Sequence, residues 1–493
     1  MSDQSLKEKV VHGVLWRMVS RLSTQAVTFV VGVVLARILG PEAYGTVAML
    51  TIFVTISETL VNCGFGAAII QKKNFTDLDW NSVFWLQISL AWFFYALLYL
   101  LAPNIAKFYH NEALAAVLRV QALILPVHAV HGLQMSILVR ELKFNISFII
   151  AIVGSVTSAI CGLSLAFMGF GFWALVYSTL IGGIASMCVS CIYVRKFPKL
   201  EFSFRSLREM FSFGGRMLAS DVFGTAMNDV TGMVIARVYT PKDLACYTRG
   251  NQLAHTIMDL VNSSLTNVSF PAFSKLQDDP IRLTSAMRKV LMCSTFFVMP
   301  MMAGLSAVTD SVIVLMLGDK WIESIPYATI ACFSSSLIPF ATVNLQAMKG
   351  LGLSGSYFYV TIIKGLMTLI ILTIFCRAGV FMLAVGFVAI STPLSMVINN
   401  WPIRNAIGYG VWNQIRDVLP VATLSVVMGT VVWSVRFIWH GPHAILLAFQ
   451  MMLGVGLYYV LLLLFKPLAL TLVIEGLPWV GKFFPRQAHS ISK

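Results

Sequence analysis

Apolar runs of about 20 residues, the length that crosses a bilayer as an α-helix, follow one another along almost the whole chain. Only short loops separate them, so little sequence remains for a large water-soluble domain. Charged residues make up 11% of the chain, whereas a soluble domain carries roughly 25%. We therefore predict an all-α polytopic membrane protein.

The runs predict about 14 transmembrane helices. Their approximate ranges are 11–37, 43–68, 81–102, 114–138, 146–168, 172–194, 210–238, 247–270, 286–307, 325–347, 357–376, 380–401, 417–438 and 443–465. With both termini in the cytoplasm, roughly 22 of the 35 Lys and Arg residues fall in cytoplasmic segments and about 7 on the far side, as the positive-inside rule requires. This bias needs an even number of helices, and 12 remains an alternative if one pair is miscounted.

The chain also repeats itself with an offset of 200 residues. Residues 34–62 and 234–262 share 7 identities in 29 positions without a gap. The shared residues include Arg37 and Arg237, Pro41 and Pro241, and a Leu-Val-Asn triplet that ends at Asn262. We therefore predict two parallel six-helix repeats, related by an axis along the membrane normal, with a substrate site between them near the midplane.

The repeats give a provisional division of the chain. Residues 1–196 form the N-terminal lobe, and 197–209 a basic cytoplasmic linker. Residues 210–404 form the C-terminal lobe, and 405–493 hold two further transmembrane helices and a cytoplasmic tail.

The most unusual predicted helix is 247–270, because its polar residues share one face. They recur every three or four positions, as neighbours on a helix do: Arg249, Gln252, Thr256, Asp259, Ser263 and Thr266. Polar groups at membrane depth are costly unless they face protein or a water-filled cavity. This face is expected to line a central cavity; polar contacts between packed helices are the alternative.

Four short segments follow one another along the chain: Leu35–Gly45 (LARILGPEAYG), Gly64–Lys72 (GFGAAIIQK), Phe270–Asp279 (FPAFSKLQDD) and Leu317–Trp321 (LGDKW). In this order they resemble the polysaccharide transporters of the multidrug/oligosaccharidyl-lipid/polysaccharide (MOP) exporter superfamily, in particular the Wzx-type, colanic-acid-exporter-like branch. The resemblance covers about residues 5–465.

The resemblance implies a transporter without enzymatic activity in the bacterial inner membrane. It implies a flippase that moves a polyprenyl-diphosphate-linked oligosaccharide, such as an exopolysaccharide, capsule or O-antigen repeat unit. Membrane lipids surround such a protein, and a polysaccharide polymerase with its chain-length machinery is an expected partner. No cofactor is implied.

A diphosphate needs compensating cations, and the arginine fork suits phosphate. The candidate substrate-binding residues are Arg17, Arg21, Arg216, Arg249, Gln252 and Lys364. The resemblance implies arginines on the first and eighth helices, which matches Arg17, Arg21 and Arg249. Arg17, Arg216 and Lys364 could instead extend to the headgroups, and Arg249 could anchor the outer leaflet.

Several acids lie within the predicted helices and are candidates for ion coupling: Glu58, Asp221, Asp229 and Asp259. Any of them could instead form a structural ion pair. His128 and His131 lie three apart in an apolar helix. Two histidines without nearby carboxylates or thiols make a poor metal site, so packing is favoured and no metal is predicted.

Two other functions remain open. A drug or cation antiporter of the same superfamily would favour an acidic cavity, whereas the polar helices carry at least as many arginines as acids. A membrane-embedded glycosyltransferase or acyltransferase would show an acidic or histidine cluster in a loop, and none is visible. The net charge of +14 is scattered over short loops, which does not indicate nucleic-acid binding.

Overall fold

A computed structural model describes residues 3–62, 65–66, 69, 72, 75–141, 143–196, 198–439 and 441–476, with side chains left undescribed at 3–22, 209–221, 228, 260, 264, 267, 354 and 475–476. The described residues lie in helices and short connections, and none of them is in a strand. The chain forms two compact units, Met1–Ala245 and Cys246–Lys493.

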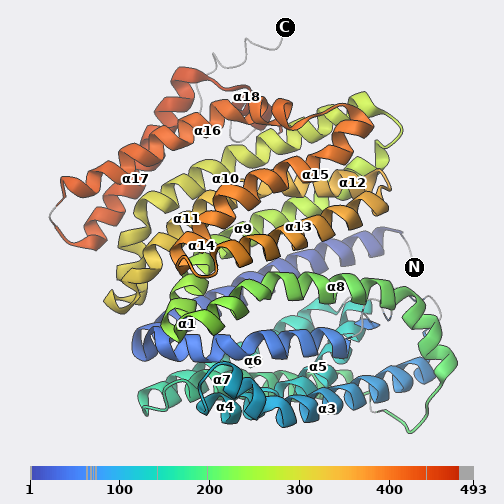
Figure 1. The fold of residues 1–493 in the computed structure, drawn as a ribbon. Helices are drawn as coiled ribbons and strands as arrows, with labels where there is room; N and C mark the ends of the chain where they lie inside the picture. The colour runs from blue at the N-terminus through green and yellow to red at the C-terminus, as the bar shows by residue number, and fades with distance from the viewer. Residues whose placement is uncertain are drawn as a thin grey trace. The chain divides into compact units, whose positions relative to one another are not determined.

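Unit 1 is a bundle of antiparallel helices (Figure 1). Its helices are α1 (Asp3–Asn62), α3 (Asp77–Phe108), α4 (Ala113–Gln121), α5 (Ile124–Arg140), α6 (Phe144–Phe167), α7 (Trp173–Val194) and α8 (Phe204–Val238). A buried cluster around Trp80, with Phe65, Val83 and Leu133, packs their inner faces. The next helix, α9 (Pro241–Lys275), begins in unit 1 and continues into unit 2.

Unit 2 contains the rest of α9 and a second group of helices. They are α10 (Pro280–Leu317), α11 (Ile325–Ser336), α12 (Ile338–Gly350), α13 (Ser354–Phe375), α14 (Val380–Gly386), α15 (Thr392–Ile407), α16 (Val411–Ser434), α17 (His443–Phe465) and α18 (Leu468–Gly476). Helix α10 packs along both α16 and α17 (Figure 1). A large buried cluster that includes Phe273, Leu291 and Val421 forms the core of this unit.

The predicted helices 11–37 and 43–68 leave a turn between them, and this turn is present at Gly40-Pro41 as a sharp break inside α1. Gly40 has φ 74° and ψ 177°, a conformation that only glycine adopts without strain. Two hundred residues further on, the chain leaves α8 at Tyr239, which is extended (φ −121°, ψ −170°), and α9 begins at Pro241. Both breaks therefore fall at positions that the 200-residue offset aligns.

Three predicted helices are each divided in two. The range 114–138 becomes α4 and α5, 325–347 becomes α11 and α12, and 380–401 becomes α14 and α15, the last pair joined by a π-helical turn, Phe387–Ser391. Each new helix has a proline within its first three residues: Pro126, Pro339 and Pro393. Proline lacks an N–H and disfavours helical geometry in the residue before it, so a helix restarts at such a point.

Among the described residues, eleven helices are long and apolar enough to cross a membrane, which makes this a multi-pass membrane protein. The first two predicted spans are joined in one of these segments, Ser23–Asn62. The polar helices α8 and α9 are not among the eleven. Their transmembrane placement, the total of 14, the repeat organisation and the lobe boundaries at 196 and 404 stay predictions.

The linker before α8 is held by hydrogen bonds to the start of α3. The amide of Lys199 donates to Asn81 Oδ1 at 3.1 Å, and Trp85 Nε1 donates to the Lys199 carbonyl at 2.8 Å. The amide of Ser203 donates to Ser82 Oγ at 2.9 Å. Because these bonds dock the linker onto α3, α8 packs with unit 1.

Asp79 is the centre of this junction. Its carboxylate accepts from Lys72 Nζ at 2.8 Å and from the Thr76 amide at 2.9 Å, and Ser206 donates to it across the junction. The side chain is only 4% exposed. A buried, multiply bonded carboxylate of this kind stabilises the fold only as long as all its partners remain.

We expect Asp79→Ala to lower the free energy of unfolding by about 2–4 kcal/mol, because it leaves buried partners without an acceptor. The measurement is thermal unfolding in detergent, followed by tryptophan fluorescence. Asp77→Ala is the matched control, since that side chain is 76% exposed in its pair with Lys196, and little change is expected there. Equal effects of the two substitutions would contradict the role of Asp79.

Candidate functional site

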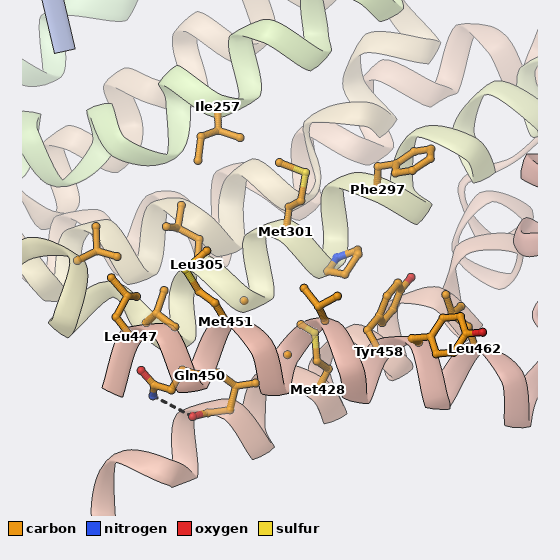
Figure 2. Close-up of a pocket in the computed structure, with 18 of the residues that line it drawn as sticks. Ile257, Phe297, Met301, Leu305, Met428, Leu447, Gln450, Met451, Tyr458 and Leu462 are labelled. Atoms are coloured by element: carbon orange, nitrogen blue, oxygen red, sulfur yellow. Dashed lines mark hydrogen bonds between the residues drawn. The ribbon is translucent and has the colours of Figure 1, made fainter. Parts of the chain in front are cut away.

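A groove of about 630 Å³ lies within unit 2, between α10 on one side and α16 and α17 on the other (Figure 2). Ile257 of α9 also lines it. The remaining lining residues are almost all apolar: Phe296, Phe297, Pro300, Met301, Gly304, Leu305, Val308, Val312, Met428, Val432, Leu447, Gln450, Met451, Gly454, Val455, Tyr458, Tyr459 and Leu462. Sequence periodicity does not reveal this groove, because each helix alone is a generic apolar span.

The groove is open along one side. Phe297, Met301, Met451 and Val455 all line it and are exposed at the surface of the unit. In a membrane protein such side chains meet lipid tails. Methionine is unbranched and adaptable, so the rim can accommodate a flexible hydrocarbon chain.

The polar groups of the groove are used mainly in holding its walls together. Gln450 donates its amide to the Val432 carbonyl at 3.0 Å, which ties α17 to α16 (Figure 2). Tyr458 donates its hydroxyl to the Phe296 carbonyl at 3.3 Å, which ties α17 to α10. The free interior therefore presents hydrocarbon surface.

Two glycines keep the groove open where α10, α16 and α17 approach. A Cβ on Gly304 would lie 3.8 Å from the Met428 methyl group, and one on Gly454 would lie 3.4 Å from a Val432 methyl group. A larger side chain at Gly304 would thus extend into the groove without colliding with backbone.

The polar face predicted on α9 contains an interacting pair. Arg249 Nη1 donates to Gln252 Oε1 at 2.7 Å, and the arginine is half-buried. Ile257, which lines the groove, lies eight residues beyond Arg249 on the same helix, which corresponds to roughly 12 Å. One helix therefore carries both a cationic, amide-rich segment and a wall of the apolar groove.

Lys364 lies deeper in its helix than the sequence analysis assumed. Helix α13 begins at Ser354 instead of 357, so Lys364 is ten residues, or roughly 15 Å, from the helix start. The side chain is half-buried, and its ammonium group has no hydrogen bond or ion pair among the described residues. At this depth, extension to the headgroups explains the lysine less well than an inward role.

In unit 1, Glu58 pairs with a histidine that the sequence analysis had assigned to packing. His128 Nδ1 of α5 lies 2.8 Å from Glu58 Oε1 of α1, and both side chains are about one-third exposed. His131, one turn later, hydrogen-bonds with the Ser186 backbone. The packing interpretation of His128 is therefore wrong. The signal that could have found the pair is the need of a membrane-embedded acid such as Glu58 for a partner.

Asp229 and Asp259, the other candidates for ion coupling whose side chains the structure describes, do not join the Glu58–His128 pair. Asp229 is half-buried on α8. Asp259 is exposed on α9, and among the described residues it forms no ion pair with His255 or any other residue. The side chains of Arg17, Arg21, Arg216 and Asp221 lie outside the described residues. No cluster that could hold a metal ion is found in the part of the chain that the structure describes.

Comparison with known proteins adds to this geometry. The sequence profile of a family described as "Polysaccharide biosynthesis protein" matches residues 34–326, more than half of the chain. The chain belongs to this family. This confirms the resemblance to the polysaccharide transporters of the MOP superfamily.

Three similar relatives carry names from polysaccharide biosynthesis. "Succinoglycan biosynthesis transport protein ExoT" of Rhizobium meliloti is 24% identical over 73% of this chain and 73% of its own length. "Lipopolysaccharide biosynthesis protein WzxC" of Escherichia coli is 26% identical over 66% and 67%. "Teichuronic acid biosynthesis protein TuaB" of Bacillus subtilis is 22% identical over 87% and 90%.

Solved structures show which fold this is. An inward closed conformation of the lipid II flippase MurJ matches with a TM-score of 0.72 and 16% identity, covering 92% of this chain and 98% of that one. An inward-facing multidrug resistance transporter of the MATE family, titled as a member of the MOP superfamily, matches with a TM-score of 0.60 and 16% identity over 82% and 99%. The fold is that of MOP-superfamily transporters.

Proposed function

We propose that this protein is a flippase that moves a polyprenyl-diphosphate-linked oligosaccharide from the cytoplasmic to the periplasmic leaflet of the bacterial inner membrane. The observation that carries the proposal is on α9, where Arg249 and Gln252 lie eight and five residues before Ile257, which lines the apolar groove. A lipid-linked sugar has a hydrocarbon tail joined to a diphosphate, and this helix offers a surface for each. The names of the relatives support the substrate class.

In this proposal the diphosphate is bound by cations. Arginine donates to phosphate oxygens in a bidentate geometry, and such charge-assisted bonds are roughly twice as strong as neutral ones. Arg249, hydrogen-bonded to Gln252, is the first proposed cation, and Lys364 supplies a second one within the membrane. Arg17, Arg21 and Arg216 complete the proposed set.

The groove holds the part of the polyprenyl chain next to the diphosphate. Lipid tails are as apolar as the groove, so moving the chain from bilayer to groove yields little hydrophobic free energy. The role of the groove is therefore orientation, because a polyprenyl chain that fits it holds the diphosphate next to the polar residues of α9.

Transport by alternating access needs an energy source, and the Glu58–His128 pair is the proposed coupling site. The pair joins a carboxylate and an imidazole, two groups that can each take up and release a proton. Asp221, Asp229 and Asp259 remain further candidates. The protein is proposed to act without enzymatic activity, with both termini in the cytoplasm, alongside a polysaccharide polymerase and its chain-length machinery.

Arg249→Ala and Arg21→Ala test the function directly. We expect each to lower export of the polysaccharide roughly tenfold to a hundredfold, the effect of losing one charge-assisted bond of about 1.5–3 kcal/mol. The measurement is polysaccharide export together with the leaflet distribution of the lipid-linked precursor, at matched membrane levels of each variant. Arg282→Ala is the control, because Arg282 is an exposed residue in the first turn of α10.

Accumulation of precursor in the cytoplasmic leaflet of the two arginine variants supports the proposal. Full export by both variants would assign these arginines a structural role. If deletion of the gene left precursor flipping intact and raised drug sensitivity, the drug antiporter would replace the flippase as the proposed function.

A further inference from the structure

A second cavity lies at the corner where α15 ends and α16 begins. Its volume is about 590 Å³. The described residues that line it are Val397, Asn400, Trp401, Arg404, Gly408, Gly410, Val411, Trp412 and Asn413. It contains none of the candidate flippase residues and is separate from the groove of Figure 2.

Arg404 gives this cavity its charge. Among the described residues the guanidinium has no hydrogen bond or ion pair, and no acid lines the cavity. By contrast, Arg288 in the same unit is paired with Asp417 at 2.5 Å. A Cβ on Gly410 would lie 3.7 Å from Arg404 Cδ, so the arginine stem packs over the turn into α16. Among the described residues, the exposed Arg404 therefore has no acidic partner.

Two tryptophans flank Arg404 on the walls of the cavity. Trp401 is 64% exposed and Trp412 is 77% exposed. Trp401 precedes Arg404 by three residues on α15, so the two lie on one side of the helix. Exposed tryptophan at the ends of membrane helices is typical of the headgroup level of a bilayer. The cavity therefore opens at the depth where phosphates of lipids lie.

One lining residue also belongs to the buried polar network of unit 2. Asn400 donates to the Tyr409 carbonyl at 3.0 Å and to Asn344 Oδ1 at 3.4 Å. The side-chain amides of Asn344 and Gln414 form two hydrogen bonds with each other, of 3.1 and 2.8 Å, which join α12 to α16.

A second branch of the network starts at Tyr409, whose hydroxyl donates to Asp417 at 2.9 Å, and Asp417 pairs with Arg288. The network therefore ties together α10, α12, α15 and α16. A molecule bound in the cavity would contact this network at Asn400.

We propose that the cavity binds the headgroup of an anionic phospholipid and that the bound lipid stabilises the helix corner of unit 2. The phosphate takes the place of the missing counterion of Arg404. The amide of Asn413 and the two indoles contact the glycerol region, and an acyl chain follows the exposed side of α15 at Val397. The absence of an acid among the described lining residues favours an anionic headgroup, because the amine of a zwitterionic one would have no partner.

The test uses the full chain in detergent, with phosphatidylglycerol or phosphatidylcholine added to the micelles. We expect phosphatidylglycerol to raise the apparent unfolding temperature by roughly 2–4 °C at saturation, and native mass spectrometry to detect the retained lipid. Arg404→Gln and Asn413→Asp each remove this response, the first by loss of charge and the second by repulsion. Arg404→Lys retains most of it.

Arg416→Gln is the control, since Arg416 is an exposed residue of α16 outside the cavity, and it should respond as the unaltered protein does. Using two variants of different chemistry keeps the result interpretable if one fails to fold. An undiminished response in Arg404→Gln or Asn413→Asp, equal stabilisation by phosphatidylcholine, or no response of the unaltered protein would overturn the proposal. Full stabilisation by inorganic phosphate alone would replace the lipid with a free anion and overturn it as well.

Discussion

Replacing Gly304 with phenylalanine is expected to reduce flipping by on the order of tenfold or more while the protein still reaches the membrane. The phenyl ring would enter the groove between α10, α16 and α17, where a Cβ meets only the Met428 methyl group at 3.8 Å. The ring would displace the polyprenyl chain and so misplace the diphosphate relative to α9, and a misplacement of about 1 Å can cost on the order of a hundredfold in rate. The helix itself tolerates the change, because phenylalanine is a better helix former than glycine.

The measurement is transport of a lipid-linked oligosaccharide in reconstituted vesicles, with thermal unfolding recorded for each variant. Gly456→Phe is the matched control: it is an exposed glycine of α17 that does not line the groove and has open space around it. We expect normal transport from this control. Normal transport by Gly304→Phe would show that the groove does not hold the substrate.

The second large effect is expected from Glu58→Gln. It keeps the shape and a hydrogen-bonding group next to His128 but removes the acid that can carry a proton. If the pair couples transport to a proton gradient, the imposed gradient should no longer accelerate flipping, and the driven rate should fall by on the order of tenfold or more. Seating of the polyprenyl chain in the groove should change little, because the pair is in unit 1 and the groove in unit 2.

This prediction is measured in vesicles with and without an imposed pH difference. Glu42→Gln is the control, an exposed acid of the same helix, and it should retain the gradient response. His128→Asn should resemble Glu58→Gln, since it removes the partner. If an imposed pH difference still accelerated flipping in Glu58→Gln, this carboxylate would be excluded as the coupling group. Asp229 and Asp259 would then be the next candidates.

The sequence by itself determined the class of fold and most of the helix positions. Long apolar runs leave no alternative to membrane helices, because unpaired backbone groups are too costly in lipid. The local sequence also located the turn at Gly40, before Pro41, whereas Pro126, Pro339 and Pro393 lie where helices restart inside three ranges that were each predicted as one helix. The spacing of Arg249 and Gln252 placed them on one face, since helical geometry depends only on nearby residues.

Only the tertiary structure decided which side chains from distant helices meet. The groove is formed by methyl groups and glycines of α10, α16 and α17, which are indistinguishable in sequence from lipid-facing residues. The Glu58–His128 pair joins positions 70 residues apart, and the network around Asn400 joins four helices. Apolar periodicity defines a helix and not its neighbours, so the grooves and ion pairs between helices followed from packing alone.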